Sequence, residues 1–131
     1  MLRIPTPLSE AVETLMHDVI GCCIAVHRVL GPGLLETIYS RAIALELTAA
    51  GITFERERAF AVTYRGELLY EQRLDFVVAG AIVLEIKAVE HLIPIHDAQL
   101  VNYMRIAKLR AGLLMNFNAV VLKDGLKRKV L

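Results

Sequence analysis

The chain has 131 residues, 56% of them hydrophobic, and its 15 Lys and Arg nearly balance its 14 Asp and Glu, for a net charge of +1. A chain of this length buries a sizeable core, and we expect residues 1–131 to form a single domain. The balanced charge excludes a protein that coats nucleic acid with a strongly basic surface, although an enzyme that contacts a few phosphates remains open. The high apolar content predicts an oligomer interface, and we expect a homodimer.

The sequence contains no membrane-spanning or secretory pattern. No apolar run reaches the roughly 18 uncharged residues of a membrane span. Residues 1–5 lack the apolar stretch of a signal peptide. Cys22 and Cys23 are adjacent on a helical pattern, so they point in different directions and should pack as small hydrophobic side chains. We therefore expect a cytoplasmic protein without a membrane partner.

Two helices are predicted in the first part of the chain. Apolar residues spaced three and four apart predict a helix that opens at residues 7–10 and ends at the Gly-Pro-Gly sequence of residues 31–33. A second helix is expected from about Leu34 to Ala50, with Gly51 as its C-terminal stop.

From Thr53 onward the apolar period changes to two, which predicts strands. The predicted elements are a strand ending at Tyr64 before the Arg65-Gly66 turn, strands Leu68–Val78 and Ile82–Val89, a helix with Pro94 as its first residue followed by Ile95–Ala107, and a strand Ala111–Phe117. We also expect residues 120–130 to form a hairpin that turns at Asp124-Gly125. The predicted order is α-α-β-β-β-α-β, an α/β fold with a small extra β element.

An aspartate and an acid-x-lysine triplet stand on the two neighbouring strands. Glu85 and Lys87 are two apart, so they share a face of their strand. A two-residue loop at Ala79-Gly80 would place Asp75 opposite Leu84, on the wrong face. A loop of residues 79–81 pairs Val78 with Ile82 and places Asp75 opposite Glu85. A shared site therefore requires the odd-length loop.

Such a site has the chemistry of a nuclease. Mg²⁺ takes oxygen ligands and usually binds one or two carboxylates, which Asp75 and Glu85 would supply, with the Ile86 carbonyl as a third ligand. Lys87 would orient or deprotonate the attacking water, or stabilise the charge that builds on the phosphate. The alternative interpretation is a cross-strand charge ladder in which Lys87 pairs with Asp75 or Glu71.

Further polar residues stand on the predicted helices. Glu36 opens the second helix and either points inward or is an ordinary acid in a first turn. Gln99 and Tyr103 share a face of the third helix, where they would position a water or phosphate oxygen or simply bond to the sheet. His96 lies near them, without metal-ligand spacing. A basic cluster would contact phosphates or form a solvated tail: Arg56, Arg58, Arg73, Lys123, Lys127, Arg128 and Lys129.

These residues together resemble the bacterial GxxExxY protein family, which is placed in the PD-(D/E)xK nuclease-like superfamily. The resemblance rests on Gly33-Leu34-Leu35-Glu36-Thr37-Ile38-Tyr39, on Asp75 with Glu85-Ile86-Lys87, and on residues 94–100, Pro-Ile-His-Asp-Ala-Gln-Leu. One position departs from the motif, because Leu74 stands where proline is usual.

The resemblance implies a restriction-endonuclease-like core, which is a mixed central sheet of about four strands flanked by helices. It implies Glu36, Asp75, Glu85 and Lys87 as the catalytic acids and lysine, and Gln99 and Tyr103 as the Q-x-x-x-Y element. Asp75, Glu85, Ile86 and Glu36 would then hold Mg²⁺ or Mn²⁺. The expected function is hydrolysis of nucleic acid, with DNA favoured over RNA. The alternative is a non-catalytic nucleic-acid-binding or oligomeric interaction protein on the same fold.

Overall fold

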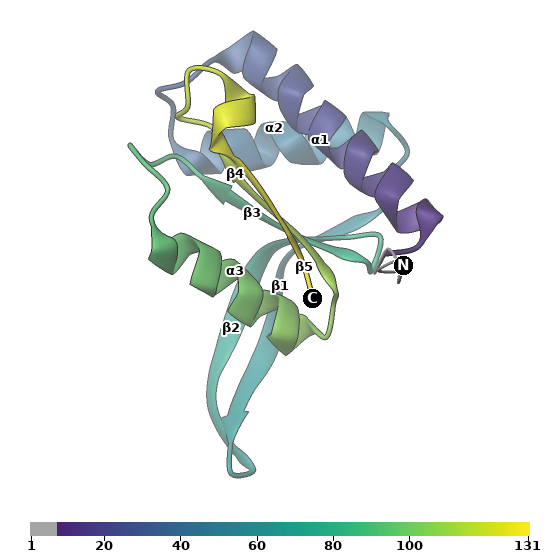
Figure 1. The fold of residues 1–131 in the computed structure, drawn as a ribbon, viewed down its shortest axis with the longest axis vertical. Coiled ribbons are helices and arrows are strands. Elements are labelled where there is room, and N and C mark those ends of the chain that lie inside the picture. The colour runs from purple at the N-terminus through teal and green to yellow at the C-terminus, as the bar shows by residue number, and fades with distance from the viewer. Residues whose placement is uncertain (1–7) are drawn as a thin grey trace, which may run out of the picture.

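The computed structural model describes residues 8–131, and it contains a five-stranded sheet with helices on both faces (Figure 1). The elements in chain order are α1 (Glu10–Leu30), α2 (Glu36–Ala49), β1 (Phe54–Tyr64), β2 (Glu67–Val78), β3 (Ile82–Lys87), α3 (Pro94–Ala107), β4 (Ala111–Asn116), a short 3₁₀ helix η1 (Leu122–Gly125) and β5 (Leu126–Val130). The predicted order α-α-β-β-β-α-β is confirmed, and β5 adds a fifth strand. The expectation for residues 1–5 and the predicted role of Pro7 lie outside the described residues.

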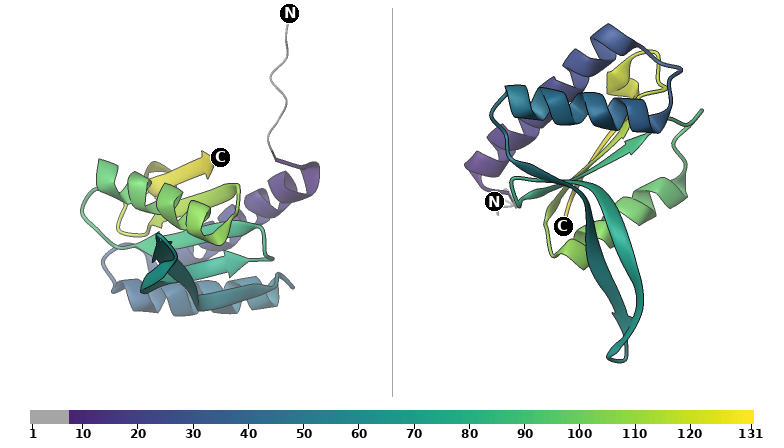
Figure 2. Two further views of the ribbon diagram at one scale, coloured as in Figure 1. Left: turned by 90° about the horizontal axis from the view of Figure 1, so that it is seen from below. Right: turned by 180° about the vertical axis from the view of Figure 1, so that it is seen from behind.

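The strands follow one another across the sheet in the order β1-β2-β3-β4-β5. The β3–β4 pair is parallel and the other pairs are antiparallel, so the sheet is mixed as expected. The parallel pair requires a crossover, which α3 provides. Figure 2 shows α3 on one face of the sheet and α1 and α2 on the other. No helix within residues 8–131 is long and apolar enough to cross a lipid bilayer.

Two hydrophobic cores join the helices to the two faces of the sheet. The larger core joins α1 and α2 to the sheet and includes Cys23, Tyr39 and Phe117, all fully buried. The smaller core joins α3 to the opposite face through Leu74, Val83, Leu100, Met104 and other apolar side chains. Both cysteines are free and buried, which confirms their expected packing as small hydrophobic side chains.

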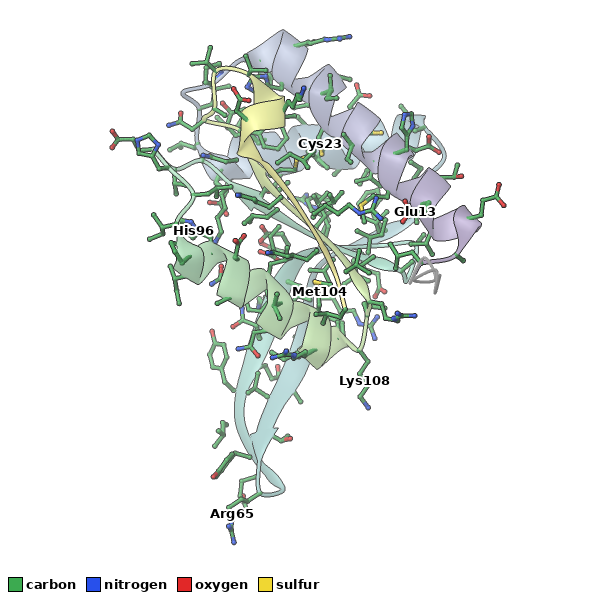
Figure 3. All side chains as sticks on the ribbon, viewed as in Figure 1. Glu13, Cys23, Arg65, His96, Met104 and Lys108 are labelled. Atoms are coloured by element: carbon green, nitrogen blue, oxygen red, sulfur yellow. The ribbon has the colours of Figure 1, made fainter. Side chains whose placement is uncertain are left out.

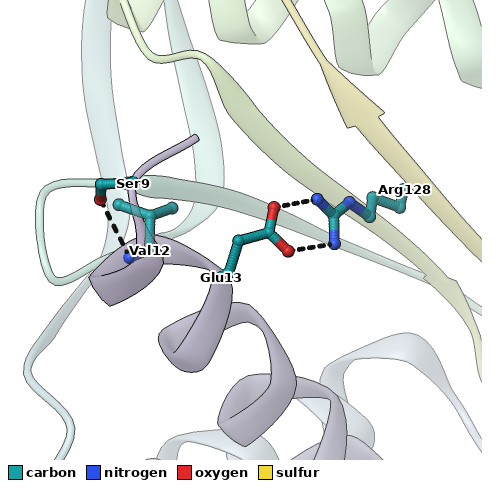
Figure 4. A network of polar contacts seen from close by, with 4 residues as sticks. All are labelled: Ser9, Val12, Glu13 and Arg128. Atoms are coloured by element: carbon teal, nitrogen blue, oxygen red, sulfur yellow. Dashed lines mark hydrogen bonds and ion pairs between the residues drawn. The ribbon is translucent and has the colours of Figure 1, made fainter. Parts of the chain in front are cut away.

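Helix α1 is fixed at its N-terminus by a cap and by an ion pair to the last strand (Figure 4). The Ser9 hydroxyl accepts a hydrogen bond from the Val12 N–H at 3.2 Å, which satisfies one of the unpaired donors of the first turn. Glu13 forms a two-bond ion pair with Arg128 of β5. The hydrogen bond from Arg128 lowers the pKa of Glu13. These contacts tie the helix layer to the edge of the sheet.

The turn between β2 and β3 has the odd length that a shared site requires. Val78 pairs with Ile82, and Phe76 pairs with Leu84. Ala79 and Gly80 adopt left-handed backbone conformations with φ of 50° and 63°. The Ala81 N–H then donates to the Val78 carbonyl at 2.9 Å and closes the turn. The predicted register is confirmed, and it places Asp75 level with Glu85.

The hairpin predicted for residues 120–130 is wrong. Val120 and Val121 are 83% and 55% exposed and belong to no strand. The chain instead forms η1, with Leu122 buried, and returns as β5 to pair antiparallel with β4. Gly125 lies against the end of β4, where an added Cβ would stand 2.5 Å from the Asn116 carbonyl oxygen. Tertiary packing against β4 therefore overrides the local turn signal.

Other predicted boundaries shift by a residue or two. Helix α2 begins at Glu36 rather than Leu34, and β3 ends at Lys87 rather than Val89. After β3, the buried Asn116 side chain bonds both the N–H and the carbonyl of Val89, at 3.0 and 2.9 Å. This contact draws the chain away from the strand and holds the segment that follows Lys87.

We expect Ser9→Ala to lower the free energy of unfolding by about 1 kcal/mol, because the cap of α1 is lost. Chemical denaturation followed by circular dichroism measures the change. Ser9→Asp keeps an acceptor at the cap and should stay close to the parent. Equal stability of Ser9→Ala and the parent would contradict the role assigned to the cap.

Gly112→Ala should destabilise the protein by about 1–3 kcal/mol, because it overpacks the contact between β4 and α3. The added Cβ would lie 2.5 Å from Met104 Sδ and 3.2 Å from Leu100 Cδ1. The matched control is Gly21→Ala in α1, where nothing lies within 4 Å of the added Cβ. That change should be neutral or stabilising by up to about 1 kcal/mol, since Ala favours helix over Gly. Similar losses in both variants would argue against the close approach.

Candidate functional site

The site lies where β2 leaves β3. The two strands pair only from Phe76 to Val78, whereas β2 continues to Glu67 alongside β1. Side-chain alternation also changes at this point, because Phe76 belongs to the core under α1 and α2 and Leu74 belongs to the core under α3. The regular alternation predicted along β2 therefore fails at Asp75. We call this divergence of the two strands the fork.

At the fork, two carboxylates replace the backbone hydrogen bonds of the missing ladder. The Asp75 N–H donates to Glu85 Oε1 at 3.0 Å. The Ile86 N–H donates to Asp75 Oδ2 at 2.9 Å. Each acid thus satisfies a backbone donor on the opposite strand, where an unpaired buried N–H would be costly. The sequence-predicted pair is brought together, and each of its members has a structural role.

The pair is electrostatically strained. Glu85 is only 4% exposed. Burial raises the pKa of Glu85 well above its ordinary value, and the nearby Asp75 charge and a hydrogen bond between the two carboxyl groups raise it further. The Asp75 N–H and the Lys87 charge act in the opposite direction. Two acids held together in a poorly solvated place favour a proton or a cation between them.

Glu36 approaches Asp75 from the layer of α1 and α2. It is the first residue of α2 and lines a small pocket of about 100 Å³ together with Asp75 and residues of β1. Burial raises the pKa of Glu36, the Asp75 charge raises it further, and Lys87 lowers it. Although the residue as a whole is exposed, its carboxyl group lies within electrostatic range of both Asp75 and Lys87.

Tyr39 fixes the position from which Glu36 projects. Its hydroxyl donates to the Gly31 carbonyl at 2.6 Å and accepts from the Leu34 N–H at 3.1 Å. Its ring stacks on Phe117, with centroids 4.7 Å apart. Tyr39 therefore closes the loop before α2 and anchors that helix to the end of β4. In the G-x-x-E-x-x-Y sequence, Glu36 thus lines the candidate site, whereas Tyr39 supports the helix that carries Glu36.

Glu57 is a site residue that the sequence reasoning missed. It lines the same pocket as Glu36 and Asp75. Its neighbours Arg56 and Arg58 pair with Phe76 and Leu74, which leaves Glu57 level with Asp75. Its φ of 50° takes it out of the regular ladder, a conformation that is uncommon for a residue with a side chain. The alternating charges of residues 55–58 give no sequence signal that singles it out.

On the other face, α3 contributes Tyr103. Burial raises the pKa of Tyr103, and the negative charges of Glu85 and Asp75 raise it further. Tyr103 therefore lies within electrostatic range of the carboxylate pair. Gln99 is half-buried one turn earlier, and the side-chain hydrogen bonds among residues 8–131 do not include it. His96, at the start of the same helix (Figure 3), accepts a hydrogen bond from the Ile93 N–H at 3.0 Å. That local contact accounts for His96 without a role in the site.

Much of the predicted basic cluster is paired within the protein. Arg128 binds Glu13, Arg58 binds Glu55 at 3.0 Å, and the Lys129 amine lies 3.7 Å from Asp97. Arg56 lines the pocket of Glu36 and stacks over Phe76, with its guanidinium carbon 5.6 Å from the ring centroid. Arg56 is thus the member of the cluster that lines the candidate site.

The part of the chain that the structure describes holds no ready-made cluster of three or more His, Cys, Asp or Glu side chains for a metal. At the fork, one oxygen of Asp75 and one of Glu85 face backbone donors. Their remaining oxygens, the Glu36 carboxylate and the Lys87 amine form a polar group of the kind that handles phosphate esters with the help of a divalent cation.

Comparisons with known proteins give a match to a family model. Searches of the curated proteins and of the solved structures each find no match. A family model described as the PD-(D/E)XK nuclease superfamily matches residues 13–129, a span that includes every site residue discussed above. The match covers nearly the whole chain, and the chain therefore belongs to the PD-(D/E)XK nuclease superfamily.

Proposed function

We propose that the protein is a metal-dependent nuclease that hydrolyses phosphodiester bonds at the fork. The observation that carries the proposal is the meeting of Asp75 and Glu85 through reciprocal side-chain-to-backbone bonds, with Lys87 close enough to lower the pKa of Glu85. A charge ladder alone would place such residues on an exposed strand face, whereas Glu85 is buried.

The donor set fits a hard divalent cation. Asp75 and Glu85 offer carboxylate oxygens, and we propose the Ile86 carbonyl and Glu36 as further ligands for Mg²⁺ or Mn²⁺. PD-(D/E)XK nucleases typically use divalent metals. When bound, such an ion neutralises charge on the phosphate and lowers the pKa of its water. It would also relieve the repulsion that raises the pKa of Glu85.

We propose roles for the remaining residues from their positions. Lys87 is held by a hydrogen bond from the Phe117 N–H to its carbonyl at 2.8 Å, so its amine is presented from a fixed backbone. It would orient the attacking water, accept its proton or stabilise the developing charge. Tyr103 donates from the α3 side to a phosphate oxygen, and Gln99 assists from one turn earlier. We further propose nucleic acid as the substrate, with DNA favoured over RNA.

The first test is cleavage of labelled DNA and RNA with Mg²⁺ or Mn²⁺, with and without EDTA. We expect Lys87→Ala and Asp75→Asn to lose about 10²-fold or more in rate, because each removes a group that acts on the transition state. Lys123→Ala is the matched control, since Lys123 is exposed and distant in sequence from the site. No cleavage by the parent on any substrate, or equal cleavage by Lys87→Ala, would refute the nuclease proposal.

Metal binding has a separate readout in the thermal midpoint. Mn²⁺ or Mg²⁺ should raise the midpoint of the parent, because a ligand of the native state stabilises it. Asp75→Asn and Glu85→Gln keep an amide oxygen for the fork bonds but remove a charge, so they should fold and lose this response.

The metal response should also depend on pH. The raised pKa of Glu85 in the metal-free protein means that metal binding displaces a proton. The metal-induced shift should therefore grow from about pH 6 to about pH 8. An equal shift in Glu85→Gln, or a shift that decreases as the pH rises, would contradict the assigned ligands.

A further inference from the structure

A groove lies between the β1–β2 hairpin and α3, beside the candidate site. It has a volume of about 540 Å³, within the usual range for ligand pockets. Its walls include residues 61–63 of β1, Tyr70 and Gln72 of β2, and Asn102, Tyr103 and Arg105 of α3. The hairpin extends beyond the body of the molecule, with Arg65 at its tip and α3 alongside its base (Figure 3). The groove therefore has one wall on each element.

The side chains of the groove suit an unpaired nucleic-acid strand. Tyr70 is 63% exposed and offers a ring face, and aromatic rings stack with nucleobases of any sequence. Gln72 and Asn102 offer amide donors and acceptors for base edges. Among residues 8–131, Arg105 is the one charged side chain that lines the groove, and no Asp or Glu lines it. The groove is thus suited to a polyanion, unlike the acid-rich site beside it.

Tyr103 connects the groove to the carboxylate pair. Tyr103 lines the groove and also lies within electrostatic range of Tyr70, on the hairpin, and of Glu85 and Asp75, at the fork. A nucleic-acid strand that contacts Tyr70 and continues past Tyr103 would therefore approach the acids. In a duplex the base faces are already stacked on their neighbours, so they are not free to meet a tyrosine ring.

We propose that this groove binds single-stranded nucleic acid and leads it to the fork, so that the substrate of the site is an unpaired strand or end rather than an intact duplex. The proposal rests on the proposed nuclease function and specifies its substrate class. Bases stack on Tyr70, Arg105 contacts a phosphate, and the scissile phosphate lies beside Asp75 and Glu85.

The experiment measures binding of fluorescein-labelled oligothymidylate and oligouridylate by anisotropy in EDTA, with an unlabelled blunt duplex as competitor. Tyr70→Ala should weaken binding of both single strands about tenfold or more. Tyr70→Phe should bind like the parent, because the ring is kept. The duplex should compete poorly.

Matched controls separate the groove from general surface effects. Tyr64→Ala removes an equally exposed tyrosine, 66% against 63%, on the same hairpin but outside the groove. It should bind like the parent. Arg105→Ala should weaken binding and reduce its salt dependence, whereas Arg41→Ala, an exposed arginine on α2, should not. Circular dichroism verifies that each variant is folded.

The outcomes distinguish this proposal from the nuclease proposal. Tyr70-dependent binding of single strands without any metal-dependent cleavage would support the groove and refute the nuclease. Cleavage of duplex and single strands alike, with Tyr70→Ala equal to Tyr64→Ala, would support the nuclease and overturn the groove. A dimer that dissociates in Tyr70→Ala, with no nucleic-acid binding by the parent, would assign the groove to a second copy of the chain and also overturn the proposal.

Discussion

The exchange of hydrogen bonds between Asp75 and Glu85 is the interaction on which the site and the shape of the sheet both depend. Two strands that stop pairing leave backbone donors without partners, and a buried unpaired donor costs about 1–3 kcal/mol. Here the donors of Asp75 and Ile86 are taken by carboxylates of the opposite strands. The acids therefore permit β2 to leave β3 and to continue with β1 as a projecting hairpin.

This solution has an electrostatic cost. The two carboxylates stand close together, one of them buried, and the pKa of Glu85 rises because of burial and the Asp75 charge. The Lys87 charge lowers the pKa of Glu85 and also that of Glu36, and it offsets only part of the rise at Glu85. An amide pair would accept the same two backbone hydrogen bonds without the repulsion. The proposed cation site would account for two acids at positions where amides would satisfy the strands.

The features of the fold and site that could be predicted are those set by the local spacing of apolar residues and by whether a loop has an odd or an even number of residues. The turn of residues 79–81 could be predicted because only an odd loop brings Asp75 level with Glu85. Helix starts at Ser9 and Pro94 carry their own chemical signals. The switch of Leu74 to the α3 face could not be predicted, because it arises from the divergence of two strands. Likewise, η1 and β5 depend on contact with β4, which no local pattern encodes.

Glu57 was not predicted from the sequence, and the roles of Gln99 and Tyr103 stayed open, for the same reason. Glu57 enters the pocket through a left-handed backbone conformation, and its side chain differs in no way from the neighbouring charges in the sequence. Spacing places Gln99 and Tyr103 on one face of α3, yet only the path of the sheet decides that Tyr103 reaches the acids. The fork lets β2 continue with β1 beyond β3, and the groove lies between that hairpin and α3. A nucleic-acid strand lying along this hairpin would therefore run toward the carboxylates at the base of the hairpin. The geometry of the sheet would itself set that path.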